Sequence, residues 1–397
     1  MRKQWTVVGL ALLSGAALAG APSSAVAELK VGVSGYVKLD IQYGDKLTGE
    51  FPSPGPGDTP LDTDLVKDNK QTIIDGRQSR LRATFSDEVA GVKLSGRIET
   101  DFFTKDVGGD SPGLATSNSA RLRLRHAFAR ADHPSGFSLL AGQYWSLFMN
   151  ETIAQPELVD FNGPAGQVFA RQPQLRVGYK TPLARGMGDL LFEVDVEKHF
   201  TSDLGDPGVN EARGEGQTVP LFAGKVSWLH PRFGIEVAGA IANSTVILPG
   251  GGDASEAAWG LQVSAQANVI EPLTIFGHFQ LIDGLARLAN ADFATAFLVG
   301  TALENVETTG WYAGASFKVT PDTTLNGVFG WHEADAIPAA GFTGSSLETH
   351  QSIHVNVIHK FWQRWQAGLE YRRFDVEAFN GTSGDVNFVH GALWFFF

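Results

Sequence analysis

The sequence predicts an all-β protein: a transmembrane antiparallel β-barrel of about 16 strands, with an inward-folded third long loop. Three observations lead to this prediction. The chain ends in a strand with one strongly apolar face, several strands carry arginines opposite their apolar face, and the connections alternate between short turns and long polar loops. Apolar and polar residues that alternate along every strand are typical of a wall with lipid on one side and water on the other.

The C-terminal stretch, Asp385 to Phe397, is apolar at every second position counted back from the end. This period of two is a strand signature. At the edge of a soluble sheet such a strand invites aggregation, whereas in a closed barrel its face meets lipid and its edge pairs with the first strand. A buried last strand of a soluble β-sandwich is the alternative. Phe395 and Phe397 also resemble the signal by which outer-membrane barrels reach their assembly machinery, so we expect that machinery as a partner.

The N-terminus predicts export. Arg2 and Lys3 precede an apolar run from Trp5 to Leu18, and Ala25-Val26-Ala27 forms a small-residue cleavage site. We therefore assign 1–27 to a removed signal peptide and 28–397 to one barrel domain in a Gram-negative outer membrane, in contact with its lipid and lipopolysaccharide. No later run of about 18 apolar residues predicts a spanning helix. The formal net charge of −12 argues against a nucleic-acid partner.

Alternation and turn residues place the strands in order. The first, Val31 to Tyr43, has valine, leucine and isoleucine on one face and Lys38, Asp40 and Gln42 on the other. The remaining predicted strands are 78–86, 92–102, 120–132, 137–145, 174–179, 190–198, 221–229, 235–242, 259–269, 273–283, 311–319, 324–333, 353–361, 365–374 and 385–397. A barrel with about 16 strands is wide enough for an aqueous channel.

Two connecting segments carry separate expectations. The first long loop holds an acidic cluster, at Asp58, Asp62, Asp64 and Asp68. These carboxylates could bind Ca²⁺, but the cluster lacks the EF-hand spacing, and a solvated acidic loop is the favoured interpretation. The segment from Gly284 to Thr308 is partly apolar, and we expect a short helix there that caps the barrel mouth or contacts a neighbouring subunit.

The most informative cluster is basic. Seven arginines fall on faces opposite the apolar ones: Arg80, Arg82, Arg97, Arg121, Arg123, Arg125 and Arg176. Facing lipid, each would cost about 2–4 kcal/mol near the midplane, so they are expected to face the interior. Such a column can attract and release anions in turn. The alternative is a structural network with inward acids on other strands, namely Glu99, Asp101, Glu193, Asp195 and Glu197.

The third long loop, Ser146 to Ala170, is too apolar for a solvated loop. Large porins narrow their channel with the loop at this position, and Glu157 and Asp160 would then oppose the arginines. A loop packed against a neighbouring subunit is the alternative. We find no phosphate-binding, zinc-protease or nucleophile-elbow motif, so we expect no enzyme, no cofactor and no metal site.

Several phrases resemble the DcaP-type trimeric outer-membrane porins. These are SGYVKLD, RQSRLR, GQYWSLFMN and PELVDFNGPAGQVFARQPQLRVGY. The resemblance implies a homotrimeric channel for dicarboxylates and other small anionic solutes. It also places Arg171 in the pore lining, together with Arg176 and the arginines of 121–125. Longer members carry a coiled-coil stretch before the barrel. Here the first strand follows the cleavage site closely, so we expect the trimer to rest on the barrel wall. A structural or adhesive barrel without conductance is the competing function, and an enzyme barrel is a more distant one.

Overall fold

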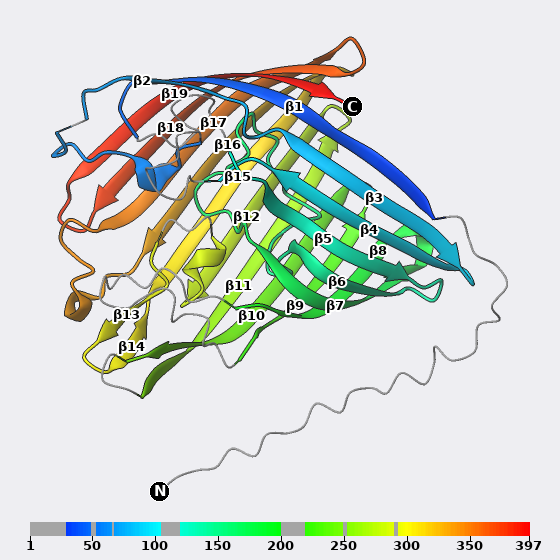
Figure 1. The fold of residues 1–397 in the computed structure, drawn as a ribbon, viewed down its shortest axis with the longest axis horizontal. Coiled ribbons are helices and arrows are strands. Elements are labelled where there is room, and N and C mark those ends of the chain that lie inside the picture. Colours follow the sequence, from blue (N-terminus) through cyan, green and yellow to red (C-terminus); the bar gives the residue numbers. More distant parts are fainter. Residues whose placement is uncertain are drawn as a thin grey trace, which may run out of the picture.

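The computed structural model describes residues 29–48, 53–65, 67–104, 120–199, 219–248, 252–289 and 293–397. Within these ranges the chain forms an antiparallel β-barrel, with β1 beside β19 where the wall closes (Figure 1). The predicted signal peptide lies outside the described residues. None of the helices in the described part is long and apolar enough to cross a membrane.

The wall is built from strands that follow one another around the barrel. In order they are β1 (Lys30–Gly44), β2 (Gln71–Asp75), β3 (Arg80–Val89), β4 (Val92–Asp101), β5 (Arg123–Asp132), β6 (Phe137–Trp145), β7 (Arg171–Pro182), β8 (Asp189–Glu197), β9 (Leu221–His230), β10 (Phe233–Ile247), β11 (Asp253–Ile270), β12 (Leu273–Asp283), β15 (Glu307–Thr320), β16 (Thr323–Ala334), β17 (Leu347–Phe361), β18 (Trp365–Ala378) and β19 (Ser383–Phe396). Successive strands of this series pair with one another, except that β2 and β3 both pair with β1, and β1 also pairs with β19.

β2 and β3 together make one broken strand of the wall. β2 pairs with the second half of β1, from Asp40 to Gly44, and β3 pairs with the first half, from Lys30 to Tyr36. Counting β2 and β3 as one strand, the 17 strands of the sheet form a 16-stranded barrel. The predicted antiparallel β-barrel and its strand number are therefore confirmed.

The barrel closes between the first and last strands. The pairing runs from Tyr36 opposite Phe396 to Gly44 opposite Phe388. Beyond it, the main chains of Gly35 and Phe397 exchange two hydrogen bonds of 3.1 Å. A Cβ atom on Gly35 would lie 2.9 Å from the ring of Phe397, so a larger residue there would disturb the closure. The apolar face predicted for the last strand is the outward face observed.

The two faces of the wall have opposite character. On β1 the outward side chains are apolar and exposed, such as Val33 at 68%, whereas the inward Asp40 and Gln42 are fully buried. This arrangement is the reverse of a soluble protein and fits lipid outside a polar interior. One end of the barrel carries the tight turns, and we call it the short-turn end; the opposite end carries the long connections, and we call it the long-loop end.

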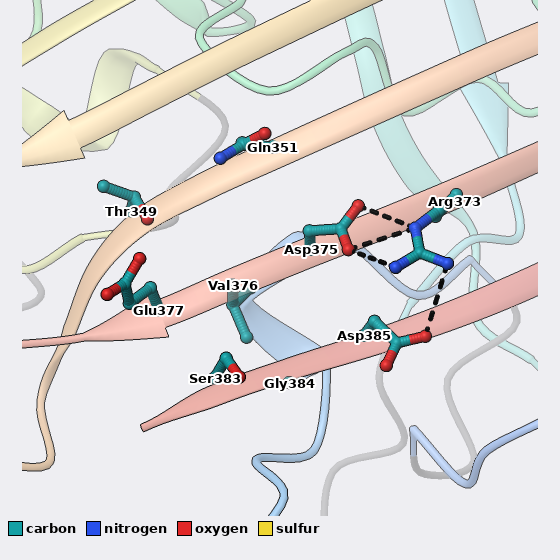
Figure 2. A pocket seen from close by; sticks show the side chains of 9 residues that line it. All are labelled: Thr349, Gln351, Arg373, Asp375, Val376, Glu377, Ser383, Gly384 and Asp385. Atoms are coloured by element: carbon teal, nitrogen blue, oxygen red, sulfur yellow. Dashed lines mark hydrogen bonds and ion pairs between the residues drawn. The ribbon is translucent and has the colours of Figure 1, made fainter. Parts of the chain in front are cut away.

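At the long-loop end the outward face becomes polar. On β18 the exposed Leu369 and Tyr371 are followed by Arg373 and Asp375 on the same face. Figure 2 shows the Arg373 guanidinium between Asp375 and a carboxylate of β19, with Nε 2.9 Å from an Asp375 oxygen and Nη1 3.6 Å from Asp385. On this face the apolar row therefore ends at Tyr371 and the next outward residue is Arg373, as expected for a membrane–water boundary.

The helix expected within 284–308 is not observed. The described part of this segment has only a single 3-10 turn, η4 (Ala286–Leu288), followed by a small hairpin of β13 (Ala296–Val299) and β14 (Ala302–Asn305). The apolar residues that suggested a helix form the hairpin instead, where Ala296 and Leu303 pack against Val246 and Ala254. Packing between neighbouring long-loop segments thus decides the structure of this stretch.

Candidate functional site

Six guanidinium groups form one cluster on the inner face of one sector of the wall, and two more on the same strands, Arg130 and Arg176, pair with other acids. Arg80 and Arg82 come from β3 and Arg97 comes from β4. The other three are Arg123 and Arg125 at the start of β5 and Arg171 at the start of β7. Period-two alternation explains most of this gathering, because the intervening residues, such as Leu81 and Leu124, are apolar and exposed outward.

Two carboxylates of β4 bind four of these arginines. Glu99 accepts hydrogen bonds from Arg82 Nε at 2.7 Å and from Arg125 Nε at 2.9 Å, and Arg80 lies 3.8 Å away. The structure therefore contains part of the structural network that was the alternative to an anion path.

Asp101 is the second of these carboxylates. It accepts two hydrogen bonds from Arg123, of 2.8 and 2.7 Å, and one of 2.9 Å from Arg125 Nη1. Its two oxygens thus hold two guanidinium groups. The four arginines tied to Glu99 and Asp101 keep a charge excess, because the two carboxylates cannot neutralise all four.

Arg97 and Arg171 have no ion pair with any described residue. The Arg97 guanidinium carbon lies 5.9 Å from the ring centre of Phe128. The corresponding carbon of Arg171 lies 4.6 Å from the Trp145 ring and 5.6 Å from that of Phe169. Aromatic faces can hold a guanidinium in place without neutralising it. These two residues therefore leave uncompensated positive charge on the inner face.

Arg176 and Arg121 are placed differently from this cluster. The Arg176 side chain is 2% exposed, and its nitrogens lie 2.6 Å from Glu151, 3.8 Å from Glu193 and 3.5 Å from Asp195. The positive charge of Arg176 is thus compensated by three neighbouring acids. Arg121 is exposed and lies two residues before β5 begins, outside the paired part of that strand.

A β-bulge interrupts β5 at Arg125. Glu99 of β4 stands opposite His126, but the next residue, Thr100, stands opposite Leu124, so one extra residue is inserted. Arg125 and His126 are consequently both buried although they are adjacent. Strict alternation along the predicted strand 120–132 places Phe128 outward with Leu124, and this is wrong, because beyond the bulge the faces exchange and Phe128 contacts His126 and Tyr144.

The bulge also brings forward a residue that the sequence pattern missed. Arg130 lies two positions beyond Phe128, on the same inner row, and binds Asp132 through two nitrogens at 2.8 to 3.0 Å. Simple alternation from Arg123 without a bulge would point Arg130 outward. An arginine on an expected lipid face was the one available signal that the alternation breaks.

The segment 146–170 is fastened to inward residues of widely separated strands. At its start, Leu147 N donates to Glu197 on β8 at 2.6 Å. In its middle, Val159 N donates to Glu370 on β18 at 2.9 Å, and Lys38 Nζ of β1 donates to Val159 O at 2.7 Å. Later, Ala165 N donates to Ser352 on β17 at 2.8 Å. Each of these strand residues lies on the face opposite the exposed apolar side chains.

Glycines on the wall make room for this segment. A Cβ atom on Gly260 of β11 would lie 2.7 Å from the ring of Phe148. A Cβ atom on Gly368 of β18 would lie 2.7 Å from Val159. Real Cβ atoms do not approach so closely, so the segment fits against the wall where side chains are missing. Its apolar residues are buried in these contacts, which explains why the sequence was too apolar for a solvated loop.

Asp160 and Glu157 do not form a matched pair of free carboxylates. Asp160 is buried and ion-paired to Arg372 of β18, and it accepts a hydrogen bond from Ser53. Burial alone would raise its pKa, but Arg372, His390 and Lys38 outweigh burial and hold the pKa of this carboxyl below its usual range. Glu157 is exposed, and only its main-chain oxygen is used, by Asn356 Nδ2 at 3.0 Å.

The acidic cluster of the first long loop serves the local backbone. Asp58 accepts from Gly55 N at 2.9 Å, and Asp64 accepts from Leu61 N at 2.8 Å. Across the described ranges, no three acidic or histidine residues come together in a way that could hold a metal ion.

Comparison with known proteins agrees with this architecture. The outer-membrane channel DcaP of Acinetobacter baumannii has a similar fold, with a TM-score of 0.72 and 20% identity over 93% of this chain and 97% of that one. An anion-selective porin from Comamonas acidovorans is similar with a TM-score of 0.56 and 13% identity, over 93% of this chain and 100% of that one. OmpT of Vibrio cholerae in its trimer form is similar with a TM-score of 0.56 and 11% identity, over 93% of this chain and 99% of that one.

A sequence search of curated proteins finds no match. A family model described as Gram-negative porin matches residues 14–378, which is most of the chain. The chain therefore belongs to the Gram-negative porin family.

Proposed function

We propose that this porin is a passive channel that favours small anionic solutes such as dicarboxylates, and that it assembles as a homotrimer. The observation that supports the proposal is the arginine cluster on the inner face, where Arg80, Arg82, Arg123 and Arg125 share only the carboxylates of Glu99 and Asp101. Arg97 and Arg171 supply the uncompensated charge. Guanidinium groups stay charged at every physiological pH and bind carboxylates through two parallel hydrogen bonds.

We further infer that the segment 146–170 folds into the barrel and narrows it. Its contacts with inward residues of β1, β8, β17 and β18 support this inference. The start of the segment also uses acids of the wall: Glu197 accepts from Leu147, and Glu236 accepts from Thr152 Oγ1 at 2.8 Å. Covering these carboxylates leaves the arginine sector as the charged surface that a solute meets.

The test is the reversal potential of the purified protein in planar bilayers under a salt gradient. Neutralising Arg97 and Arg171 together, as R97Q/R171Q, should shift that potential toward cations. A charge about 7 Å from a solute in water, screened at about 0.1 M salt, contributes roughly 0.3 kcal/mol to each ion. We therefore expect the anion-to-cation ratio to fall roughly threefold for each charge removed.

The control is R185Q, which removes one positive charge from an exposed turn at the short-turn end. It should leave the reversal potential unchanged. An unshifted potential in a folded R97Q/R171Q protein would contradict anion preference and leave a general porin. Absence of any conductance in the unmodified protein would favour the structural or adhesive barrel instead. Chemical cross-linking in outer membranes should give a trimer band.

A further inference from the structure

We propose that Gln143, on the outward face of β6, is a positioning residue for the arginines of the inner face. The proposal rests on the channel function proposed above, because it names a residue that keeps arginines of the proposed anion path pointing into the barrel. Gln143 does not itself touch the path. It acts through the main chain of β5, at the bulge that turns Arg125 inward.

The geometry of the seam between β5 and β6 carries this proposal. The two strands pair only from Asp132 opposite Ser138 up to Ala127 opposite Gln143. Beyond that point, toward the long-loop end, β5 continues to Arg123 without a partner on the β6 side. At the opening, Gln143 Nε2 donates to Leu124 O at 3.1 Å and to Arg125 O at 3.2 Å.

The chemistry of the outward face explains why a polar residue is needed there. Gln143 follows Leu139 and Ala141 in an outward row, where an apolar residue is the rule. A carbonyl oxygen left without a donor at the lipid boundary is strongly unfavourable, because lipid offers no hydrogen bond in place of water. The side-chain amide of Gln143 has two N–H groups, and it supplies the donors that a paired strand would otherwise supply.

The bulge that Gln143 supports decides which side chains of β5 face inward. On its long-loop side, Arg125 reaches Glu99 and Asp101. On its short-turn side, Phe128 and Arg130 lie inward and Ala129 is exposed outward. Without the extra residue the two parts of β5 could not both keep this phase, because a shift of one position moves every side chain to the other face.

Single cysteines can report the phase of β5 directly, because the natural chain contains none. We would place a cysteine at position 130 or 129, as R130C or A129C, and expose the folded protein to a charged thiol reagent that does not enter lipid. In the unmodified background R130C should react and A129C should be protected. Adding Q143L should slow labelling of R130C at least several-fold, and should move the reversal potential toward cations.

Q351L is the matched control, since Gln351 is also an outward glutamine, on β17 near the long-loop end (Figure 2). It should change neither labelling nor reversal potential. Q143M keeps the length of the side chain without its donors, and it replaces Q143L if that variant fails to fold. Unchanged labelling of both cysteines in folded Q143L or Q143M would overturn the positioning role. Labelling and anion preference are separate readouts. If Q143L slows the labelling of R130C as expected but the unmodified protein shows no anion preference, the result counts against the channel proposal alone.

Discussion

Glu99 shows how a single acid shapes the arginine cluster, because it holds Arg82 and Arg125 at hydrogen-bond distance while 2% of its side chain is exposed. Replacing it with glutamine, E99Q, removes the ion pair of Arg82 and leaves the buried Arg125 with Asp101 alone. We expect unfolding to become easier by about 3–5 kcal/mol, as for other broken buried pairs. We also expect stronger anion preference, because positive charge is released.

Urea unfolding of the detergent-solubilised protein, together with the reversal potential, measures both effects of E99Q. D132N is the comparison variant, since Asp132 pairs with Arg130 at a site where 42% of the acid is exposed. Exposed pairs contribute at most about 1 kcal/mol, so D132N should be close to neutral. Equal effects of the two variants would show that burial of the Glu99 network is not what makes it important.

Asp160 predicts a dependence on pH with a definite sign. Its pKa is lowered in the folded protein, so the stability it contributes is fully present above its unfolded pKa of about 3.9 and is lost as pH falls below that value. Between pH 5 and pH 3 this loss amounts to about 1 kcal/mol. The unfolding free energy of D160N should therefore fall less over this range than that of the unmodified protein, whereas that of D68N, changed at an exposed loop acid, should fall as in the unmodified protein.

The fit between the segment 146–170 and the wall depends on missing side chains in the strands. Gly260→Val would place two methyl groups where Phe148 now packs, and overpacking of this kind costs about 1–3 kcal/mol. Gly327→Val on β16 is the control, because nothing lies within 4 Å of a Cβ atom there. Limited proteolysis should cut within 146–170 faster in the Gly260 variant only. Equal cleavage of both variants would argue that the segment is held by its hydrogen bonds alone.

Closure of the whole barrel depends on Phe397 in two separable ways. Its main chain exchanges hydrogen bonds with Gly35, and its ring ends the outward apolar row of β19. Deleting Phe397 removes both features, whereas F397A keeps the main-chain bonds. We expect the deletion to lower the membrane-inserted fraction, measured by the mobility difference between boiled and unboiled protein. A reduction of equal size in F397A would assign the effect to the ring, and normal insertion of the truncated chain would refute both roles.

Period-two alternation predicted the wall well, because each strand has lipid on one side and polar groups on the other. It did not place the bulge at Arg125, since the arginine at position 130 signals that the alternation breaks but not where the extra residue is inserted. It also could not tell paired arginines from unpaired ones, because pairing depends on which carboxylate stands on the neighbouring strand. Asp160 was expected to face the arginines, but its partner Arg372 is 212 positions away along the chain, beyond the reach of any local pattern.

The contacts of the segment 146–170 also limit the order in which the parts of the barrel can assemble. Val159 binds Glu370, which follows it by 211 positions, and it binds Lys38, which precedes it by 121. The segment cannot make both contacts until the last strands have joined the first. The part of the segment around Val159 can therefore make all of its contacts only after the wall has closed. Its attachment there joins the middle of the chain to the first strand and to one of the last strands.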